Sequence, residues 1–233
     1  MSRERQVRLK ICGLQDAETI RQLAGLPIDE IGFVFAASRR QVLPAQAAML
    51  IDEVKRLTTP SGSSPRTVGV VVNMELAEIG QMLAEAPLDV VQLHGGETPE
   101  LCRAIKAKHA VDVWKVFSVT AEEAECGKEN LVAAGAGPER LAAYAGAVDA
   151  VLLDTAGGGT GKTFAWHVID AYAIEARKMG IPLYVAGGLH PDNVAELLSD
   201  YRPDGVDVSS GVETEGNKDV AKIIRFTERV KGA

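Results

Sequence analysis

The chain has 233 residues, of which 46% are hydrophobic and 24% charged, and its formal net charge is −7. This length suits one domain with a full core, and the acidic balance speaks against a nucleic-acid partner. The amino terminus is polar and no long apolar run follows, so we expect a cytoplasmic protein without signal peptide or membrane span. The cysteines Cys12, Cys102 and Cys126 form no CxxC or Cys/His cluster, so the sequence predicts neither a disulfide framework nor a metal site.

Short apolar runs rich in Val and Ile alternate with longer segments of helical character. The predicted strands cover residues 7–12, 30–35, 67–72, 90–93, 113–116, 150–154, 183–186 and 205–208. The predicted helices cover residues 16–24, 44–57, 74–86, 99–108, 138–145, 165–179, 192–199 and 218–231. Such alternation indicates a parallel sheet covered by helices, and eight units favour closure over an open doubly wound sheet. We therefore expect an α/β fold in which residues 1–233 form a single parallel (β/α)8 TIM barrel.

Two segments depart from this alternation. Residues 58–66 form a small polar loop rich in Pro, Gly and Ser, and residues 118–137 form a fifth connection of unusual length. Neither segment divides the chain into two domains, and the longer one suggests no functional role.

The active site of such a barrel lies at the carboxyl ends of its strands and in the loops that follow. Polar or reactive residues stand at these positions, whereas the strand interiors are mostly apolar. The positions are Cys12, Arg39, Arg40, Asn73, His94, Asp154, Gly187, Gly188, Ser209 and Ser210.

Cys12 and Asp154 are candidates for proton transfer. Lys10 lies two residues before Cys12 in a strand, so both side chains project to one face, and we expect the ammonium to lower the pKa of Cys12. A buried, inert cysteine is the alternative. Asp154 ends the apolar run of the sixth strand, where a carboxyl is a helix cap, a structural ion-pair partner or a general acid. Strands 1 and 6 face each other across a barrel, so the pair could act on opposite sides of one small substrate.

Residues 186–193 and 207–213 follow strands 7 and 8, where barrels often bind phosphate through backbone N–H groups and a helix N-terminus. Glycines let the backbone approach a phosphate, and serine hydroxyls add donors. Tight turns alone would also explain the glycines, but two such loops in the two expected places favour an anion site.

Residues 156–163 nearly match the Walker A pattern, with Ala156 at the first glycine position. A Walker A loop normally follows an early strand, so we interpret this segment as a glycine-rich loop near a substrate phosphate, with nucleotide binding as the alternative. Arg39 and Arg40 could hold a carboxylate or phosphate, or remain solvated. His94 either orients the substrate or satisfies a strand-end hydrogen bond.

The chain contains an ordered set of motifs from its first to its last predicted strand: KICGL (10–14), GFVFAASRRQV (32–42), VGVVVN (68–73), VQLHGGE (91–97), LLDTAGGGTGKTFAW (152–166), AGGLHPDNV (186–194) and DVSSGVETEGNKD (207–219). This set resembles the phosphoribosylanthranilate isomerase family of tryptophan biosynthesis over nearly the whole chain.

The resemblance implies an Amadori rearrangement of N-(5-phosphoribosyl)anthranilate, with Asp154 as general acid and Cys12 as general base. Arg40 would hold the anthranilate carboxylate, and the phosphate would bind Gly187, Gly188, Ser210 and Gly211. Lys10, His94 and Gly159 would complete the pocket of a phosphorylated small-molecule substrate. The steps are proton transfers, so the family needs no metal or organic cofactor, and we expect a monomer or homodimer without nucleic-acid or membrane partners.

One residue departs from the family pattern, because Ala165 stands where the family commonly has Asp and could loosen a helix cap. Two other sugar-phosphate enzymes are less compatible with the sequence. An indole-glycerol-phosphate synthase would need lysines and glutamates at strand exits, and a pentose-phosphate epimerase would need a His/Asp metal set. A non-catalytic barrel that binds a phosphorylated metabolite is a third alternative, and the presence of both Cys12 and Asp154 argues against it.

Overall fold

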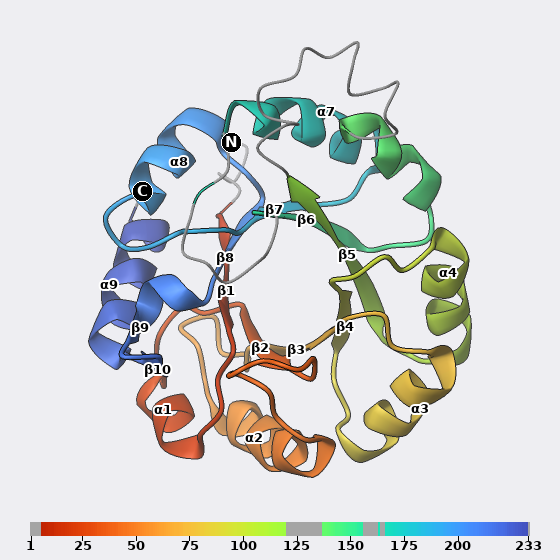
Figure 1. Cartoon of the computed structure of the whole chain (residues 1–233). Coiled ribbons are helices and arrows are strands. Elements are labelled where there is room, and N and C mark those ends of the chain that lie inside the picture. Colours follow the sequence, from red (N-terminus) through yellow and green to blue (C-terminus); the bar gives the residue numbers. More distant parts are fainter. Residues whose placement is uncertain (1–5, 120–136, 156–162, 164–165, 233) are drawn as a thin grey trace.

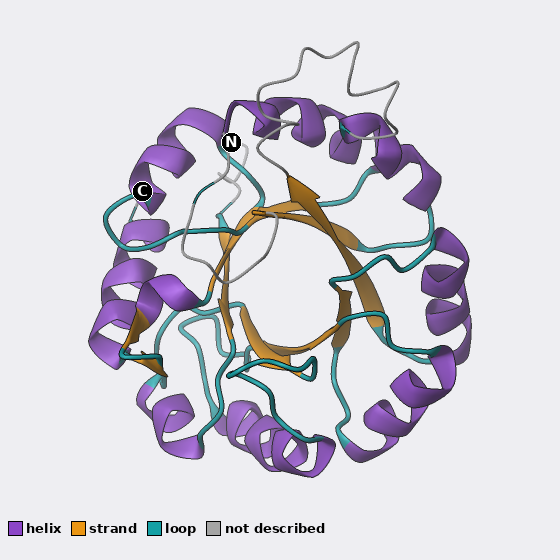
Figure 2. Cartoon of the chain, in the orientation of Figure 1, coloured by secondary structure: helices purple, strands orange, loops and turns teal. Residues whose placement is uncertain are grey.

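A computed structural model describes residues 6–119, 137–155, 163 and 166–232. Its eight parallel strands form a closed barrel in chain order, and helices surround the barrel (Figures 1 and 2). The strands are β1 (Arg8–Cys12), β2 (Glu30–Val34), β3 (Arg66–Val71), β4 (Val90–Leu93), β5 (Asp112–Val119), β6 (Ala150–Thr155), β7 (Leu183–Val185) and β8 (Gly205–Val208). β1 closes the barrel, because Lys10 lies opposite Glu30 of β2 and Asp207 of β8. The predicted (β/α)8 fold is confirmed.

The helices follow the strands in the expected order. They are α1 (Ala17–Gln22), α2 (Pro44–Arg56), α3 (Leu76–Glu85), α4 (Pro99–Lys108), α7 (Ile169–Met179), α8 (Val194–Tyr201) and α9 (Val220–Lys231). Local chemistry explains several of their starts: the side chains of Asp16, Thr98 and Asp219 accept from backbone N–H groups of the first turn. Pro44 and Pro99 occupy first helical positions, where the missing N–H has no cost.

The described residues also include shorter elements. The 3-10 turns among them are η1 (Pro138–Tyr144), η2 (Trp166–Val168) and η3 (Ser210–Val212), and β9 (Glu213–Thr214) pairs with β10 (Asn217–Lys218) in a small hairpin. The helix expected at 138–145 is thus a 3-10 turn. It begins at a proline and is held by Arg140, which donates to the Tyr172 hydroxyl and the Ser118 carbonyl, both at 2.8 Å. In the part of the chain that the structure describes, no helix is both long and apolar enough to cross a membrane.

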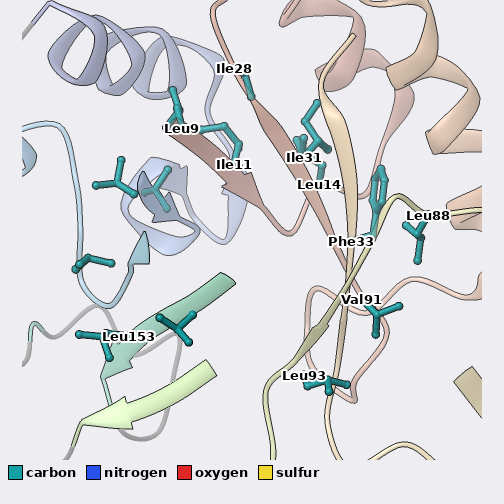
Figure 3. Packing of buried hydrophobic residues seen from close by; sticks show 14 of the residues in the cluster. Leu9, Ile11, Leu14, Ile28, Ile31, Phe33, Leu88, Val91, Leu93 and Leu153 are labelled. Carbon is teal, nitrogen blue, oxygen red and sulfur yellow. The ribbon is translucent and has the colours of Figure 1, made fainter. Parts of the chain in front are cut away.

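The main hydrophobic core lies between the barrel and the ring of helices. Strand residues alternate in direction, and the outward side chains pack against the helices (Figure 3). Leu9 and Ile11 of β1, Ile31 and Phe33 of β2, and Val91 and Leu93 of β4 have no exposed surface. Each such side chain contributes roughly 1.5–3 kcal/mol through burial, so this layer fixes the strands that carry the site.

The inside of the barrel is divided into an apolar and a charged part. The apolar part is formed by Val68, Val90, Trp114, Val116, Ala150, Leu152, Tyr184 and Ala186. Strands β1, β2 and β8 instead carry the charged side chains of Arg8, Lys10, Glu30 and Asp207, which pair as Arg8–Glu30 and Lys10–Asp207. These three strands are still mostly apolar in sequence, but they present charged side chains to the barrel interior. Pairing explains the difference, because buried charges persist when they neutralise one another.

Candidate active site

A cavity of about 440 Å³ opens at the carboxyl ends of the strands, a volume within the usual range for small-molecule sites. Several predicted residues line it together: Cys12, Arg40, His94, Asp154, Gly187, Gly188, Ser209 and Ser210. Gln92 and Asp207, which were not predicted, also line it. Gly159 lies outside the described residues, as does most of the 156–163 loop.

Cys12 is the last residue of β1 and is 7% exposed. Gly32 of β2 makes room for it, because a Cβ at that position would lie 2.8 Å from the Cys12 Sγ. Lys10 is fully buried under the pocket, where its Nζ donates to Asp207 Oδ2 at 2.9 Å. The structure therefore places Cys12 in the pocket wall and Lys10 beneath it.

The predicted direction of the Cys12 pKa shift is wrong. Burial raises the pKa of the thiol, and the neighbouring cations Lys10 and Lys218 act in the opposite direction without outweighing it. Burial also works against the Lys10 ammonium, but Asp207 and Cys12 hold the pKa of Lys10 above its ordinary value. Lys10 thus stays charged and reduces the cost of forming a thiolate at Cys12.

Asp154, near the end of β6, is anchored on both of its carboxylate oxygens. Oδ1 accepts from the Thr155 backbone N–H at 2.7 Å, and Oδ2 lies 3.3 Å from Nε2 of His94. His94 thus lines the pocket beside the candidate acid, and its proposed role in orienting the substrate stays a prediction. Gly187 has a φ of 81°, and a Cβ there would lie 2.9 Å from Asp154 Oδ1, so glycine lets the β7–α8 loop reach this carboxylate.

The two predicted phosphate loops lie against each other. Gly187 and Gly188 after β7 both have positive φ, and Ser210 belongs to the turn η3 after β8. Gly211 packs so closely on the Leu189 carbonyl that a Cβ there would overlap it. Asn193 holds the β7–α8 loop, because its Nδ2 donates to the Gly188 carbonyl at 3.0 Å. The loops thus form one continuous side of the pocket.

Arg40 lines the pocket but is already paired. Its Nε and Nη2 donate to the two carboxylate oxygens of Glu213 at 2.7 and 3.1 Å. Lys218 donates to the same carboxylate at 2.8 Å, and Arg39 also contacts it. Burial opposes the charge on Glu213, but the hydrogen bonds from Arg40 and Lys218 outweigh it and lower the pKa of Glu213 to about 2. One carboxylate therefore holds three cations, which leaves excess positive charge at this wall.

Sequence reasoning missed Glu213, Lys218, Asp207 and Gln92. Asp207 and Gln92 interrupt apolar strands, and their alternation with outward residues was a signal that they face the barrel interior. No local pattern indicated a role for Glu213 and Lys218, because Glu213 acts through its contact with Arg40, which lies far away in the sequence. Within the described ranges, no group of three or more His, Cys, Asp or Glu side chains could hold a metal ion.

The chain forms a closed (β/α)8 barrel, and one pocket is surrounded by a cysteine, a carboxylate and two glycine–serine loops. These features define the class of barrel enzymes that act on small anionic metabolites. The family model described as N-(5'phosphoribosyl)anthranilate (PRA) isomerase matches residues 9–229. The chain belongs to this family, and with it to the isomerase enzymes of tryptophan biosynthesis.

Individual relatives agree with this assignment. N-(5'-phosphoribosyl)anthranilate isomerase of Brevibacillus brevis is 42% identical over 228 residues, which cover 96% of this chain and 93% of the relative. The solved phosphoribosylanthranilate isomerase of Thermotoga maritima is 34% identical with a TM-score of 0.75, over 98% of this chain and all of that one. A structure of such an isomerase with reduced 1-(o-carboxyphenylamino)-1-deoxyribulose 5-phosphate is 31% identical, with a TM-score of 0.71 and 98% and 100% coverage.

Proposed function

We propose that this chain converts N-(5-phosphoribosyl)anthranilate to 1-(2-carboxyphenylamino)-1-deoxyribulose 5-phosphate, with Asp154 as general acid and Cys12 as general base. The observation that carries the proposal is the convergence of Cys12 and Asp154, from β1 and β6, on one pocket beside the Gly187–Gly188 and Ser210 loops. The relative solved with the reduced product supports the substrate class, a phosphorylated small molecule.

The steps are proton transfers. Asp154 gives a proton to the ring oxygen of the ribose, the bond from that oxygen to C1 breaks, and C1 forms a Schiff base with the anthranilate nitrogen. The Cys12 thiolate takes the proton from C2, which leaves an enolamine. C1 then gains a proton and the C2 hydroxyl loses one, so the ketone forms without net change in atoms or electrons. Lys10 and Lys218 support the thiolate by their charge.

The two ends of the substrate are anionic, and the pocket offers a partner for each. The β7 and β8 loops present backbone N–H groups and serine hydroxyls for the phosphate. Arg40 uses one edge of its guanidinium for Glu213 and retains N–H groups for the anthranilate carboxylate. The Thermotoga maritima relative is described as dimeric, and a monomer or homodimer remains our prediction for this chain.

The test is turnover of the fluorescent substrate by the variants Cys12→Ser and Asp154→Asn. Each should lose at least about a hundredfold in kcat, as expected for a missing acid or base. Cys102→Ala, at a cysteine buried in α4, and Asp170→Asn, at an exposed carboxyl of α7, are matched controls that should retain activity. Full activity of both site variants contradicts the mechanism. Rescue of a tryptophan auxotroph lacking this isomerase by both variants contradicts it as well.

A further inference from the structure

Two buried polar atoms at the floor of the pocket have no hydrogen-bond partner among the described residues. They are Oδ1 of Asp207, on β8, and Oε1 of Gln92, on β4. Asp207 is 8% exposed and Gln92 1% exposed, yet both line the cavity. Buried acceptors without partners are costly and uncommon, so these two atoms indicate donors that come from a ligand.

The surrounding described side chains supply no such donors. Lys10 donates to the other oxygen of Asp207, Oδ2. Gln92 lies between Val70 and Trp114 on the neighbouring strands, within the apolar part of the barrel interior. The cavity is therefore the side from which both groups can be satisfied.

A hydroxyl is the ligand group that suits both positions. Ionised Asp207 only accepts hydrogen bonds, so its partner must donate. The two ends of the Gln92 carboxamide can exchange places, but a hydroxyl both donates and accepts and so fits either arrangement. A sugar chain carries several such hydroxyls, one on each of its adjacent carbons.

We propose that Asp207 and Gln92 form a hydroxyl-binding subsite that holds the sugar chain of the substrate from opposite sides of the barrel. The inference rests on the proposed function and extends it to the middle of the substrate, between the phosphate loops and Arg40. Asp207 of β8 and Cys12 of the neighbouring strand β1 line the same cavity. We therefore expect the hydroxyl that Asp207 binds to lie near the carbon that Cys12 deprotonates.

The subsite also determines specificity. A substrate that lacks the matching hydroxyl leaves a buried carboxylate unpaired, and sites built around hydrogen bonds reject such analogues strongly. A water molecule that donates to Asp207 Oδ1 is the competing explanation, and it predicts no such rejection.

The experiment uses the reduced product and three analogues of it that each lack one hydroxyl, at C2, C3 or C4. Their dissociation constants are measured for the unmodified protein, Asp207→Asn and Gln92→Met. In the unmodified protein, removal of the hydroxyl held by Asp207 should weaken binding at least about tenfold. In Asp207→Asn the same removal should cost less than about threefold, and Gln92→Met should behave likewise for a different hydroxyl. Asp170→Asn, at an exposed carboxyl of α7 outside the pocket, should leave every penalty unchanged.

Equal penalties in the unmodified protein and in both variants, or no penalty at all, would overturn the subsite. Gln92→Met does not change the charge of the protein, so it tests the subsite even if Asp207→Asn does not fold. If the complete reduced product fails to bind the unmodified protein, the proposed function falls and the subsite falls with it. If it binds and the penalties do not depend on Asp207 or Gln92, only the subsite is rejected.

Discussion

Glu213 holds three cationic side chains at one wall of the pocket: Arg39, Arg40 and Lys218. Because the hydrogen bonds from Arg40 and Lys218 keep the pKa of Glu213 near 2, the carboxylate is charged throughout the neutral range. The contact with Arg40 uses two N–H groups, so it fixes the plane of the guanidinium as well as its position. Glu213 is thus a positioning residue for the group that we propose binds the anthranilate carboxylate.

We expect Glu213→Gln to raise the KM about tenfold and to leave kcat within about threefold of its original value. The neutral amide orients Arg40 less firmly, and the acid–base pair remains intact. Steady-state kinetics measure both parameters, and Glu213→Asp should restore part of the KM. Glu215→Gln changes an exposed carboxyl of the same hairpin turn and serves as the control. A fall in kcat at constant KM would contradict the positioning role.

At the scale of elements, the buried ion pair of Lys115 and Glu97 holds the connection between β4 and α4. This connection begins at His94. Glu97 accepts from the Asn73 backbone N–H at 2.8 Å and from Lys115 Nζ at 3.1 Å. Lys115 also donates to the Gly95 carbonyl at 2.7 Å. Burial opposes the charge on Glu97, but Lys115 and the backbone N–H groups outweigh it and lower the pKa of this carboxylate. Burial lowers the pKa of Lys115, and Glu97 acts against this shift. The pair joins the middle of β5 to the segments that follow β3 and β4.

Lys115→Met should lower the free energy of unfolding by about 3–5 kcal/mol, because it leaves the carboxylate of Glu97 buried without its counter-charge. Urea unfolding at neutral pH measures the change. The double variant Lys115→Met/Glu97→Gln should be more stable than the sum of the single effects predicts, by about 1 kcal/mol or more. Lys178→Met removes an exposed lysine from a surface pair and should change stability by less than about 1 kcal/mol. Strict additivity in the cycle would mean that the pair is not coupled.

The order of the elements was predictable from local patterns, and the pairs inside the barrel were not. Alternating apolar runs located all eight strands, and the glycine–serine loops located one side of the pocket. The ion pair of Lys10 and Asp207 joins residues 197 positions apart, and that of Arg40 and Glu213 joins residues 173 positions apart. Both pairs therefore depend on barrel closure and strand register. The error in the Cys12 pKa has the same origin. Lys10 was visible in the sequence, whereas the depth of burial depends on β2 and β8 closing around β1.

At the scale of the whole molecule, the two ends of the barrel carry different charged groups. The pocket occupies the carboxyl ends of the strands, and Glu30 lies at the opposite end, at the start of β2. Glu30 contacts Arg8 and accepts from the Tyr184 hydroxyl at 3.1 Å. Burial raises the pKa of Glu30 to about 7, although Arg8 acts against this shift. The end away from the chemistry therefore carries a titratable group that affects stability.

The sign of this effect follows from proton linkage. The folded protein keeps a proton on Glu30 that the unfolded chain releases near its ordinary pKa of 4.5, so stability falls as the pH rises from about 4.5 to about 7. Glu30→Gln removes this dependence. Its free energy of unfolding relative to the unmodified protein should therefore increase by roughly 3 kcal/mol between about pH 5 and about pH 8. Denaturant unfolding at the two pH values measures the difference, and the exposed Glu18→Gln is the control. Because Glu30 lies outside the pocket, Glu30→Gln should not change kcat. A difference in the free energy of unfolding that does not depend on pH would contradict the prediction, because Glu30 would then be ionised in the folded barrel throughout this range.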